Sequence, residues 1–210
     1  MINVQPGILI ALEGIDGSGK TTLAQFLAHQ LTHAGYSVVL TKEPGGTEFG
    51  KHMRAMLQSR PTALTPQTEF LLFAADRAQH MQEIIRPALS AGKVVISDRL
   101  SDSSVAYQGY GRGVDVDMIK QINSWIMGSI KPTITVYLEL DSQTAYQRIE
   151  QRKEQLTDFE KEQKSFFERV IHGFETLYKD RKDIIRLDAR QKPEIIAQQA
   201  LGYIYEQGLV

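Results

Sequence analysis

A glycine-rich segment near the start of the chain carries the residue types that bind a phosphate group. It runs from Gly14 to Thr21, reads GIDGSGKT and fits the pattern G-x-x-x-x-G-K-[ST]. Glycines let backbone N–H groups approach an anion closely, the lysine can reach β- and γ-phosphates, and the threonine hydroxyl can bind Mg²⁺. We therefore predict ATP contacts along the whole segment: Gly14, Ile15, Asp16, Gly17, Ser18, Gly19, Lys20 and Thr21.

A second charged motif follows a later apolar run. Asp98 and Arg99 come directly after Val94–Ser97, which reads as a buried strand. A carboxylate at this point can assist Mg²⁺ binding, and a guanidinium can bind a phosphate through two hydrogen bonds. Thr21 and Asp98 are the predicted metal ligands, and Arg99 is the predicted ligand of a second anion.

A phosphate loop does not by itself distinguish kinases from GTPases, motor ATPases or nucleotide sensors. The sequence contains no N-K-x-D guanine motif, which counts against a GTPase. The other classes stay open on these residues alone.

Apolar runs alternate with helical patterns along the chain, which is typical of an α/β protein with a parallel sheet and helices on both faces. The predicted strands cover residues 8–12, 37–41, 94–98, 133–140 and 184–187. The predicted helices cover residues 20–34, 48–58, 65–89, 142–179 and 193–207. Thr65 and Pro66 are expected to start the third helix, which bends near Pro87 and stops at Gly92. Both charged motifs then lie at carboxyl ends of strands, where such sheets bind ligands.

The composition narrows the class of protein. A chain of 210 residues with 42% hydrophobic residues and a net charge of −1 suits one globular domain, and gives no reason to expect a nucleic-acid or membrane partner. Without cysteine, neither a disulfide framework nor a thiolate metal site can form. No apolar run approaches the roughly 20 residues of a membrane span. We expect a cytoplasmic protein.

Four motifs together resemble those of bacterial thymidylate kinases. They are the segment from Glu13 to Thr21, KEPGGT from Lys42, the pair Asp98 and Arg99, and AYQGYGRG from Ala106. The resemblance extends to LFAADR from Leu72 and to LDA from Leu187. It implies a three-layer P-loop kinase fold over residues 1–210 and a homodimer that uses ATP and Mg²⁺ to convert dTMP to dTDP, a step toward dTTP for DNA synthesis.

The same resemblance implies roles for single residues around the acceptor. Asp16 would face the acceptor sugar, Phe73 would stack on thymine, and Arg77 would hydrogen-bond a base carbonyl. Arg99 would hold the acceptor phosphate, and Tyr107 would close over the ribose, where a 2′-hydroxyl would not fit. Phe73 also lies in an apolar helical stripe, so a plain core role is the alternative.

Further acceptor ligands are carried over in the same way. Glu43–Gly46 would form a loop beside the acceptor phosphate with a strained or cis Pro44 peptide, Arg54 would add a cation there, and Ser104 would contact the base edge. The predicted acceptor ligands are Glu43, Pro44, Arg54, Phe73, Arg77, Arg99, Ser103, Ser104, Tyr107 and Gln108.

Cations must also reach the transferred phosphoryl group. Some members of the family place an arginine inside the phosphate loop, where this chain has Gly17. The resemblance points instead to a mobile lid at about residues 142–163, with Arg148 and Arg152 four residues apart on one helical face; a solvated charged helix is the alternative. The predicted catalytic residues are Lys20, Arg99, Asp16 and Arg152. Arg148 and Asp188 complete the predicted ATP contacts, with the Asp188 loop beside the adenine.

Three departures from the family pattern concern the lid and the base site. Leu156–Glu160 reads LTDFE where family lids often read LDRFE, so one lid arginine is missing. Lys42 stands where arginine is commoner, and Val105 replaces a more usual polar residue beside the base. Base selectivity therefore stays open on the sequence alone.

The expected chemistry is direct in-line transfer without a covalent intermediate. The acceptor phosphate is already anionic near pH 7, so no general base is needed, and the histidines are expected to be surface or structural residues. The alternatives are another nucleoside or nucleotide kinase of the same fold, with dCMP or a deoxynucleoside as acceptor, and a non-catalytic ATP-dependent switch.

Overall fold

Five short strands form the centre of the fold, and they pair in the order β2-β3-β1-β4-β5 with every neighbour parallel. Their bounds are β1 Ile8–Glu13, β2 Val38–Lys42, β3 Val94–Asp98, β4 Ile134–Glu139 and β5 Ile184–Asp188. The computed structural model describes residues 7–58, 63–151, 158–160 and 162–208. The predicted parallel sheet is confirmed, with strand ends that differ from the prediction by at most one residue.

The central strand β1 is buried on both faces, which explains its unbroken apolar run. Ile10 and Leu12 pack into one hydrophobic cluster, while Leu9 and Ala11 pack into another on the opposite face. Because successive side chains of a strand point to opposite faces, only a continuous apolar sequence can fill both clusters.

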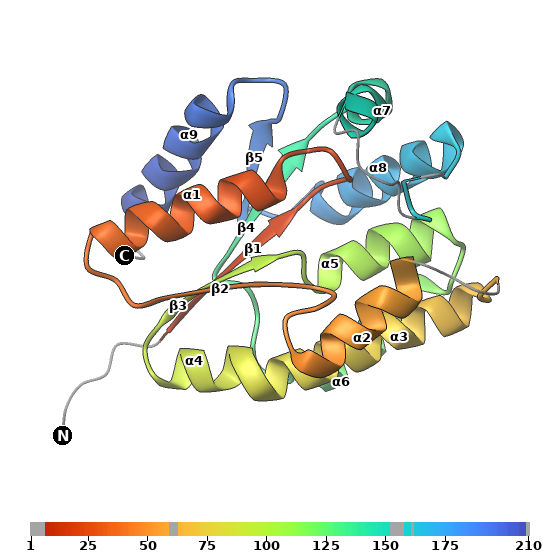
Figure 1. Ribbon diagram of the computed structural model, residues 1–210, viewed down its shortest axis with the longest axis horizontal. Helices are drawn as coiled ribbons and strands as arrows, with labels where there is room; N and C mark the ends of the chain where they lie inside the picture. The colour runs from red at the N-terminus through yellow and green to blue at the C-terminus, as the bar shows by residue number, and fades with distance from the viewer. Residues whose placement is uncertain (1–6, 59–62, 152–157, 161, 209–210) are drawn as a thin grey trace.

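Helices cover both faces of the sheet, so the predicted three-layer arrangement is confirmed (Figure 1). Helices α1 (Lys20–His33) and α9 (Pro193–Glu206) lie together on one face, above the sheet in this view. The other face carries α3 (Pro66–His80), α4 (Arg86–Ser90) and α6 (Val116–Met127), with α2 (Glu48–Gln58) packed on α3. Among the described helices, none is both long and apolar enough to cross a membrane.

The predicted helix at residues 65–89 exists, but its interior is not uniform. The hydroxyl of Thr65 accepts a hydrogen bond from the N–H of Thr68, and Pro66 takes the first turn, as predicted. A π-helical segment, η1 (Met81–Ile85), then joins α3 to α4. Pro87 lacks an N–H group and cannot complete a regular helix there, so the irregularity falls in the turn before it.

The long helical region predicted at residues 142–179 is divided. Helix α7 (Ser142–Gln151) and helix α8 (Lys164–Tyr178) are separate elements, and residues 158–160 form a turn between them. The aromatic side chains of α8 pack on Tyr107 and Tyr137, whereas α7 presents a largely polar surface.

Three elements between β3 and β4 were not predicted. They are α5 (Ser101–Ser104), the π-helical η2 (Val105–Gly111) and α6. Helix α6 had a readable signal, because Asp115 caps it, Ile119, Ile122 and Ile126 recur at helical spacing, and Gly128 follows its end. The π-helix had no comparable signal.

Candidate active site

The phosphate loop between β1 and α1 requires glycine at its first position. Gly14 has a φ of 143°, and a Cβ atom there would lie 2.7 Å from the carbonyl oxygen of Leu138. Helix α1 begins directly after the loop, at Lys20, and Gly19 gives it no side-chain cap. The first backbone N–H groups of α1 and the positive end of its dipole are therefore available to an anion.

The Lys20 side chain folds back onto the phosphate loop. Its Nζ donates hydrogen bonds to the carbonyl oxygen of Ile15 at 2.8 Å and to Ser18 Oγ at 3.4 Å. Burial and the nearby Arg99 lower the pKa of Lys20 to about 8, although Asp98 and Asp16 act in the opposite direction. An anionic ligand beside the amine would raise this pKa again and so favour the charged form.

A hydroxyl and a carboxylate meet at the end of the loop. Thr21 Oγ1 donates to Asp98 Oδ2 over 2.5 Å, which joins the start of α1 to the end of β3. No cluster of three acidic or histidine side chains occurs in the described ranges that could hold a metal by itself. One hydroxyl and one carboxylate nevertheless suit Mg²⁺, which is commonly bound by one or two protein groups together with phosphates and water.

Arg99 lies opposite the loop in an unusual backbone conformation. Its φ of 75° is the only positive value among the non-glycine residues described. Nη1 donates to the carbonyl oxygen of Gly14 at 2.9 Å and to Ser103 Oγ at 3.1 Å, and Nη2 donates to Asp16 Oδ1 at 2.8 Å. Burial acts to lower the pKa of Arg99, but Tyr107 and Asp16 raise it above its usual value, so the guanidinium stays charged.

Asp16 and Tyr107 share the guanidinium of Arg99. The Tyr107 hydroxyl donates to Asp16 Oδ2 at 2.9 Å and accepts from Arg99 Nη2 at 3.1 Å. Burial would raise the pKa of Asp16, but Arg99 and Lys20 outweigh it and hold that pKa below its usual value. Asp16 is therefore a carboxylate, and the structure brings it together with Arg99 and Tyr107, three residues to which the sequence analysis gave roles around the acceptor.

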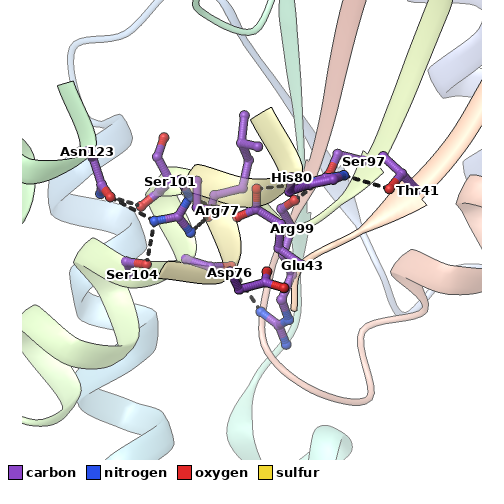
Figure 2. A network of polar contacts seen from close by, with 12 residues as sticks. Thr41, Glu43, Asp76, Arg77, His80, Ser97, Arg99, Ser101, Ser104 and Asn123 are labelled. Carbon is purple, nitrogen blue, oxygen red and sulfur yellow. Dashed lines mark hydrogen bonds and ion pairs between the residues drawn. The ribbon is translucent and has the colours of Figure 1, made fainter. Parts of the chain in front are cut away.

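A buried polar network lies behind this group (Figure 2). Glu43 accepts a hydrogen bond from Arg77 Nε at 2.8 Å and lies 2.9 Å from His80 Nδ1, while His80 Nε2 lies 2.6 Å from Thr41 Oγ1. Burial opposes ionisation of Glu43, but Arg77 and His80 lower its pKa below the usual value. The Glu43 carboxylate is thus occupied by protein partners.

Arg77 is almost entirely engaged with the protein. Besides Glu43, its Nη1 donates to Ser104 Oγ at 3.0 Å and to Asn123 Oδ1 at 2.7 Å, and its Nη2 donates to the carbonyl oxygen of Leu100 at 3.1 Å. A guanidinium has five N–H donors. Within the described part of the chain, one N–H of Nη2 is left to meet a ligand.

A cavity of about 500 Å³ is lined both by the charged residues Lys20 and Arg99 and by the aromatic rings of Phe73, Tyr107 and Phe159. Phe73 lies beside it rather than in either core cluster, and its ring meets that of Phe159 at 5.8 Å between centroids. The Phe159 ring also lies 6.5 Å from that of Tyr107. The sequence-predicted residues that line this cavity are Asp16, Gly17, Gly19, Lys20, Thr21, Glu43, Pro44, Arg54, Phe73, Arg77, Asp98, Arg99, Ser103, Ser104, Tyr107, Gln108 and Arg148.

Two loop residues predicted to contact ATP act through their carbonyl oxygens. Gly14 accepts from Arg99 and Ile15 accepts from Lys20, and neither lines the cavity.

Pro44 follows a cis peptide bond, and its carbonyl oxygen accepts from Arg54 Nη1 at 3.1 Å.

A second cavity, of about 400 Å³, adjoins the outer side of the loop. Ser18, Phe26, Arg148 and Ala189 are among the residues that line it. Arg148 donates to the carbonyl oxygens of Gly17 at 3.3 Å and Ala189 at 2.7 Å, which ties α7 to the loop. Asp188 does not line this cavity, and its carboxylate is paired with the exposed Arg190.

The predicted lid is only partly described. Arg152 lies outside the described residues, as do Lys153, Leu156 and Thr157. Phe159 and Glu160 line the larger cavity, and Arg112 bonds Glu162 at 2.6 Å and Glu69 at 3.2 Å. Arg112 belongs to the AYQGYGRG motif, but the sequence reasoning gave it no role.

Val105 does not lie where the sequence analysis put it. Its side chain packs in the core cluster with Phe70 and Ala74 and does not line the cavity, so the expectation of a valine beside the base is wrong. Val105 is the first residue of η2 and is buried. His80, Asn123 and Glu13 are buried partners of site residues that the sequence reasoning missed, because their contacts join distant segments.

The fold and the site define a P-loop phosphotransferase. Backbone amides, Lys20 and a hydroxyl–carboxylate pair are arranged for a nucleoside triphosphate, and Arg99 offers a second cationic group across the same cavity. The adjoining aromatic rings give this second position the flat apolar surface that a nucleobase requires.

Comparison with known proteins identifies the family. The family model described as thymidylate kinase matches residues 12–200. The thymidylate kinase of Halothermothrix orenii is 43% identical over 195 residues, covering 92% of this chain and 94% of the relative. Those of an Exiguobacterium species and of Bacillus licheniformis are 42% and 40% identical, and each alignment covers at least 95% of both chains. The chain belongs to the thymidylate kinase family, which confirms the resemblance inferred from the motifs.

Proposed function

We propose that this protein transfers the γ-phosphoryl group of ATP to dTMP and so forms dTDP, a step toward dTTP. The observation that carries the proposal is one cavity in which Lys20 and the phosphate loop face Arg99, with Phe73 beside them. Family membership supports the same acceptor.

In this proposal the donor nucleotide lies along the loop. Backbone N–H groups and Lys20 bind its phosphates, and the cavity lined by Phe26, Arg148 and Ala189 takes its base. Thr21 and Asp98 are the residues that would hold Mg²⁺, which when bound shields phosphate charge and orients the oxygens. The donor set of one hydroxyl and one carboxylate fits that ion.

The acceptor would lie on the other side of the same cavity. Arg99 binds its phosphate, Phe73 stacks on thymine, and Arg77 donates its remaining Nη2 N–H to a base carbonyl. Asp16 and Tyr107, which hold each other at 2.9 Å, close over the sugar and leave no room for a 2′-hydroxyl. Pro44, Arg54, Ser103, Ser104 and Gln108 complete this side of the site.

We propose direct in-line transfer. The acceptor phosphate oxygen is anionic near pH 7, so it attacks the γ-phosphorus without a base, while the bond from that phosphorus to the bridging oxygen of the β-phosphate breaks and ADP leaves. Lys20 and Arg99 lie on opposite sides of the transferred group and stabilise its charge. Arg148 and Arg152 would join them when a lid of about residues 142–163 closes over ATP and excludes water.

A homodimer is the proposed assembly. The neighbouring helices α2, α3 and α6 carry exposed apolar side chains, among them Met56, Leu71 and Trp125, and Trp125 is 82% exposed. Figure 1 shows these three helices gathered on one side of the molecule. A second copy of this chain would bury such a surface. The cytoplasm remains the proposed location, in keeping with a chain that contains no cysteine.

A coupled ADP-release assay with a panel of acceptors tests the function. We expect turnover with dTMP, less with dUMP and dCMP, and none with thymidine or without an acceptor. Arg99→Ala should remove most turnover with dTMP while ATP still binds. A preferred acceptor other than dTMP, or near wild-type turnover by Arg99→Ala, would contradict the proposal.

A further inference from the structure

Glu13 is a buried carboxyl group next to the catalytic machinery to which neither motif nor mechanism has given a role. It is the last residue of β1, directly before the phosphate loop, and is completely buried. Its side chain reaches across to the segment that connects β3 to α5, which carries Arg99. Glu13 therefore joins the segment that binds the donor to the segment that binds the acceptor.

The contacts of Glu13 close a ring with Arg99. Oε1 accepts from the backbone N–H of Leu100 at 2.9 Å, and Oε2 lies 2.5 Å from Ser103 Oγ. The same Ser103 oxygen accepts from Arg99 Nη1 at 3.1 Å, and Nη1 also donates to the carbonyl oxygen of Gly14, the neighbour of Glu13, at 2.9 Å. The guanidinium is thus tied directly to Gly14 and, through Ser103, to Glu13.

Glu13 also supports the backbone of Arg99. With a φ of 75°, Arg99 has a conformation that non-glycine residues rarely adopt, so the surrounding structure must hold it. The Arg99 N–H donates to the carbonyl oxygen of Leu12 at 2.9 Å, and Ser97 Oγ donates to the Arg99 carbonyl at 2.6 Å. The bond from Leu100 N–H to Glu13 fixes the next peptide.

We propose that Glu13 is a positioning residue that sets the distance between the phosphate loop and the guanidinium of Arg99, and hence the distance between the donor and acceptor phosphates. The inference rests on the proposed role of Arg99 as the acceptor-phosphate ligand. Misplacement of a reacting group by about 1 Å can cost about a hundredfold in rate, so such a strut matters for transfer.

The charge around Glu13 indicates that it acts by shape and hydrogen bonding. Burial above all, and then Asp102 of α5, raise the pKa of Glu13 to about 8, while Ser103 and Arg99 act in the opposite direction. Lys20 of α1 and Tyr178 of α8 also interact with Glu13 electrostatically. Burial thus favours the neutral form of Glu13, and Glu13→Gln keeps the length of the side chain and an oxygen that can accept from the Leu100 N–H.

Steady-state kinetics of three variants test the positioning role of Glu13. Glu13→Ala should lower kcat/KM for dTMP at least about tenfold while the affinity for ATP changes by less than about threefold. Glu13→Gln should stay within about threefold of wild type at pH 7. The matched control is Glu139→Ala, because Glu139 ends β4 but is 39% exposed and paired with Arg186; wild-type kinetics are expected.

A double-mutant cycle separates positioning from simple stability. In an Arg99→Ala background, Glu13→Ala should cost less than about twofold more, because the group it positions is gone. An equal loss in both backgrounds, or wild-type kinetics of Glu13→Ala, would overturn the inference. If Glu13→Ala does not fold, Glu13→Asp, whose shorter side chain cannot reach both partners, takes its place in the same cycle. Wild-type turnover by Arg99→Ala alone would instead overturn the proposed acceptor site.

Discussion

The buried pair of Glu43 and Arg77 makes the sharpest quantitative prediction about stability. The Glu43 side chain is 2% exposed, and each of its oxygens lies within 2.9 Å of a nitrogen, on Arg77 and on His80. In Glu43→Gln the Arg77 guanidinium keeps its charge but loses its counter-ion in a buried site. The NH₂ group of the glutamine must also point at a nitrogen, either Arg77 Nε or His80 Nδ1, that bonds to a carboxylate oxygen in the wild type.

The size of the effect follows from these contacts. Breaking a buried ion pair by removing one partner costs about 3–5 kcal/mol, and the glutamine carbonyl retains one of the two hydrogen bonds. We therefore expect a loss of about 3 kcal/mol, which for a chain of this length lowers Tm by about 6–12 °C. The KM for dTMP should rise because Arg77 moves, while the KM for ATP should not.

Thermal unfolding followed by circular dichroism provides the measurement. Glu48→Gln is the matched control, since the Glu48 side chain is 84% exposed and pairs with the exposed Lys51; its Tm should stay within about 1 °C of wild type. A Glu43→Gln variant that melts within about 2 °C of wild type, with an unchanged KM for dTMP, would refute the reasoning.

The pH dependence has a definite sign. The pKa of Glu43 lies below its ordinary value of 4.5, so the ionised group stabilises the folded state above that pH. The stabilisation is lost as the pH falls through the lower, folded-state pKa. The difference in stability between wild type and Glu43→Gln should therefore be constant near pH 7 and shrink below about pH 4.5.

Three further predictions concern the loop, the sugar site and the assembly. Gly14→Ala should weaken ATP binding at least about tenfold in an equilibrium titration, because its Cβ would lie 2.7 Å from a backbone oxygen, whereas Gly202→Ala in α9, with open space around it, should bind normally. Tyr107→Phe should lower kcat/KM for dTMP about tenfold through loss of the bond to Asp16, and an unchanged value would exclude the hydroxyl from the mechanism. Trp125→Glu should convert a dimer into monomers in sedimentation, and a wild-type profile would remove this tryptophan from the interface.

The motifs predicted the site well where its residues are adjacent in the chain. The loop from Gly14 to Thr21 and the pair Asp98 and Arg99 combine a strand end with a local charge pattern, so sequence alone located both. The strands were equally readable, because burial on both faces demands unbroken apolar runs.

The contacts that orient those residues could not be predicted in the same way. Glu13 meets Ser103 across 90 positions of sequence, and Arg77 meets Asn123 across 46. Nothing in the local pattern of either segment identifies such a partner. The error at Val105 has a related cause, since its side chain packs in a core cluster with Phe70 and Ala74 of a distant segment, and no local pattern identifies that cluster.

The number of hydrogen bonds that Arg77 can still donate limits how many carbonyl groups of a ligand it can bind. Four of its five N–H groups are already bonded to Glu43, Ser104, Asn123 and Leu100. An inhibitor that presents two carbonyl groups to this arginine should therefore bind no better than one that presents a single carbonyl. A ligand should gain more affinity from added contacts with the aromatic rings that line the cavity than from further hydrogen-bond acceptors placed beside Arg77.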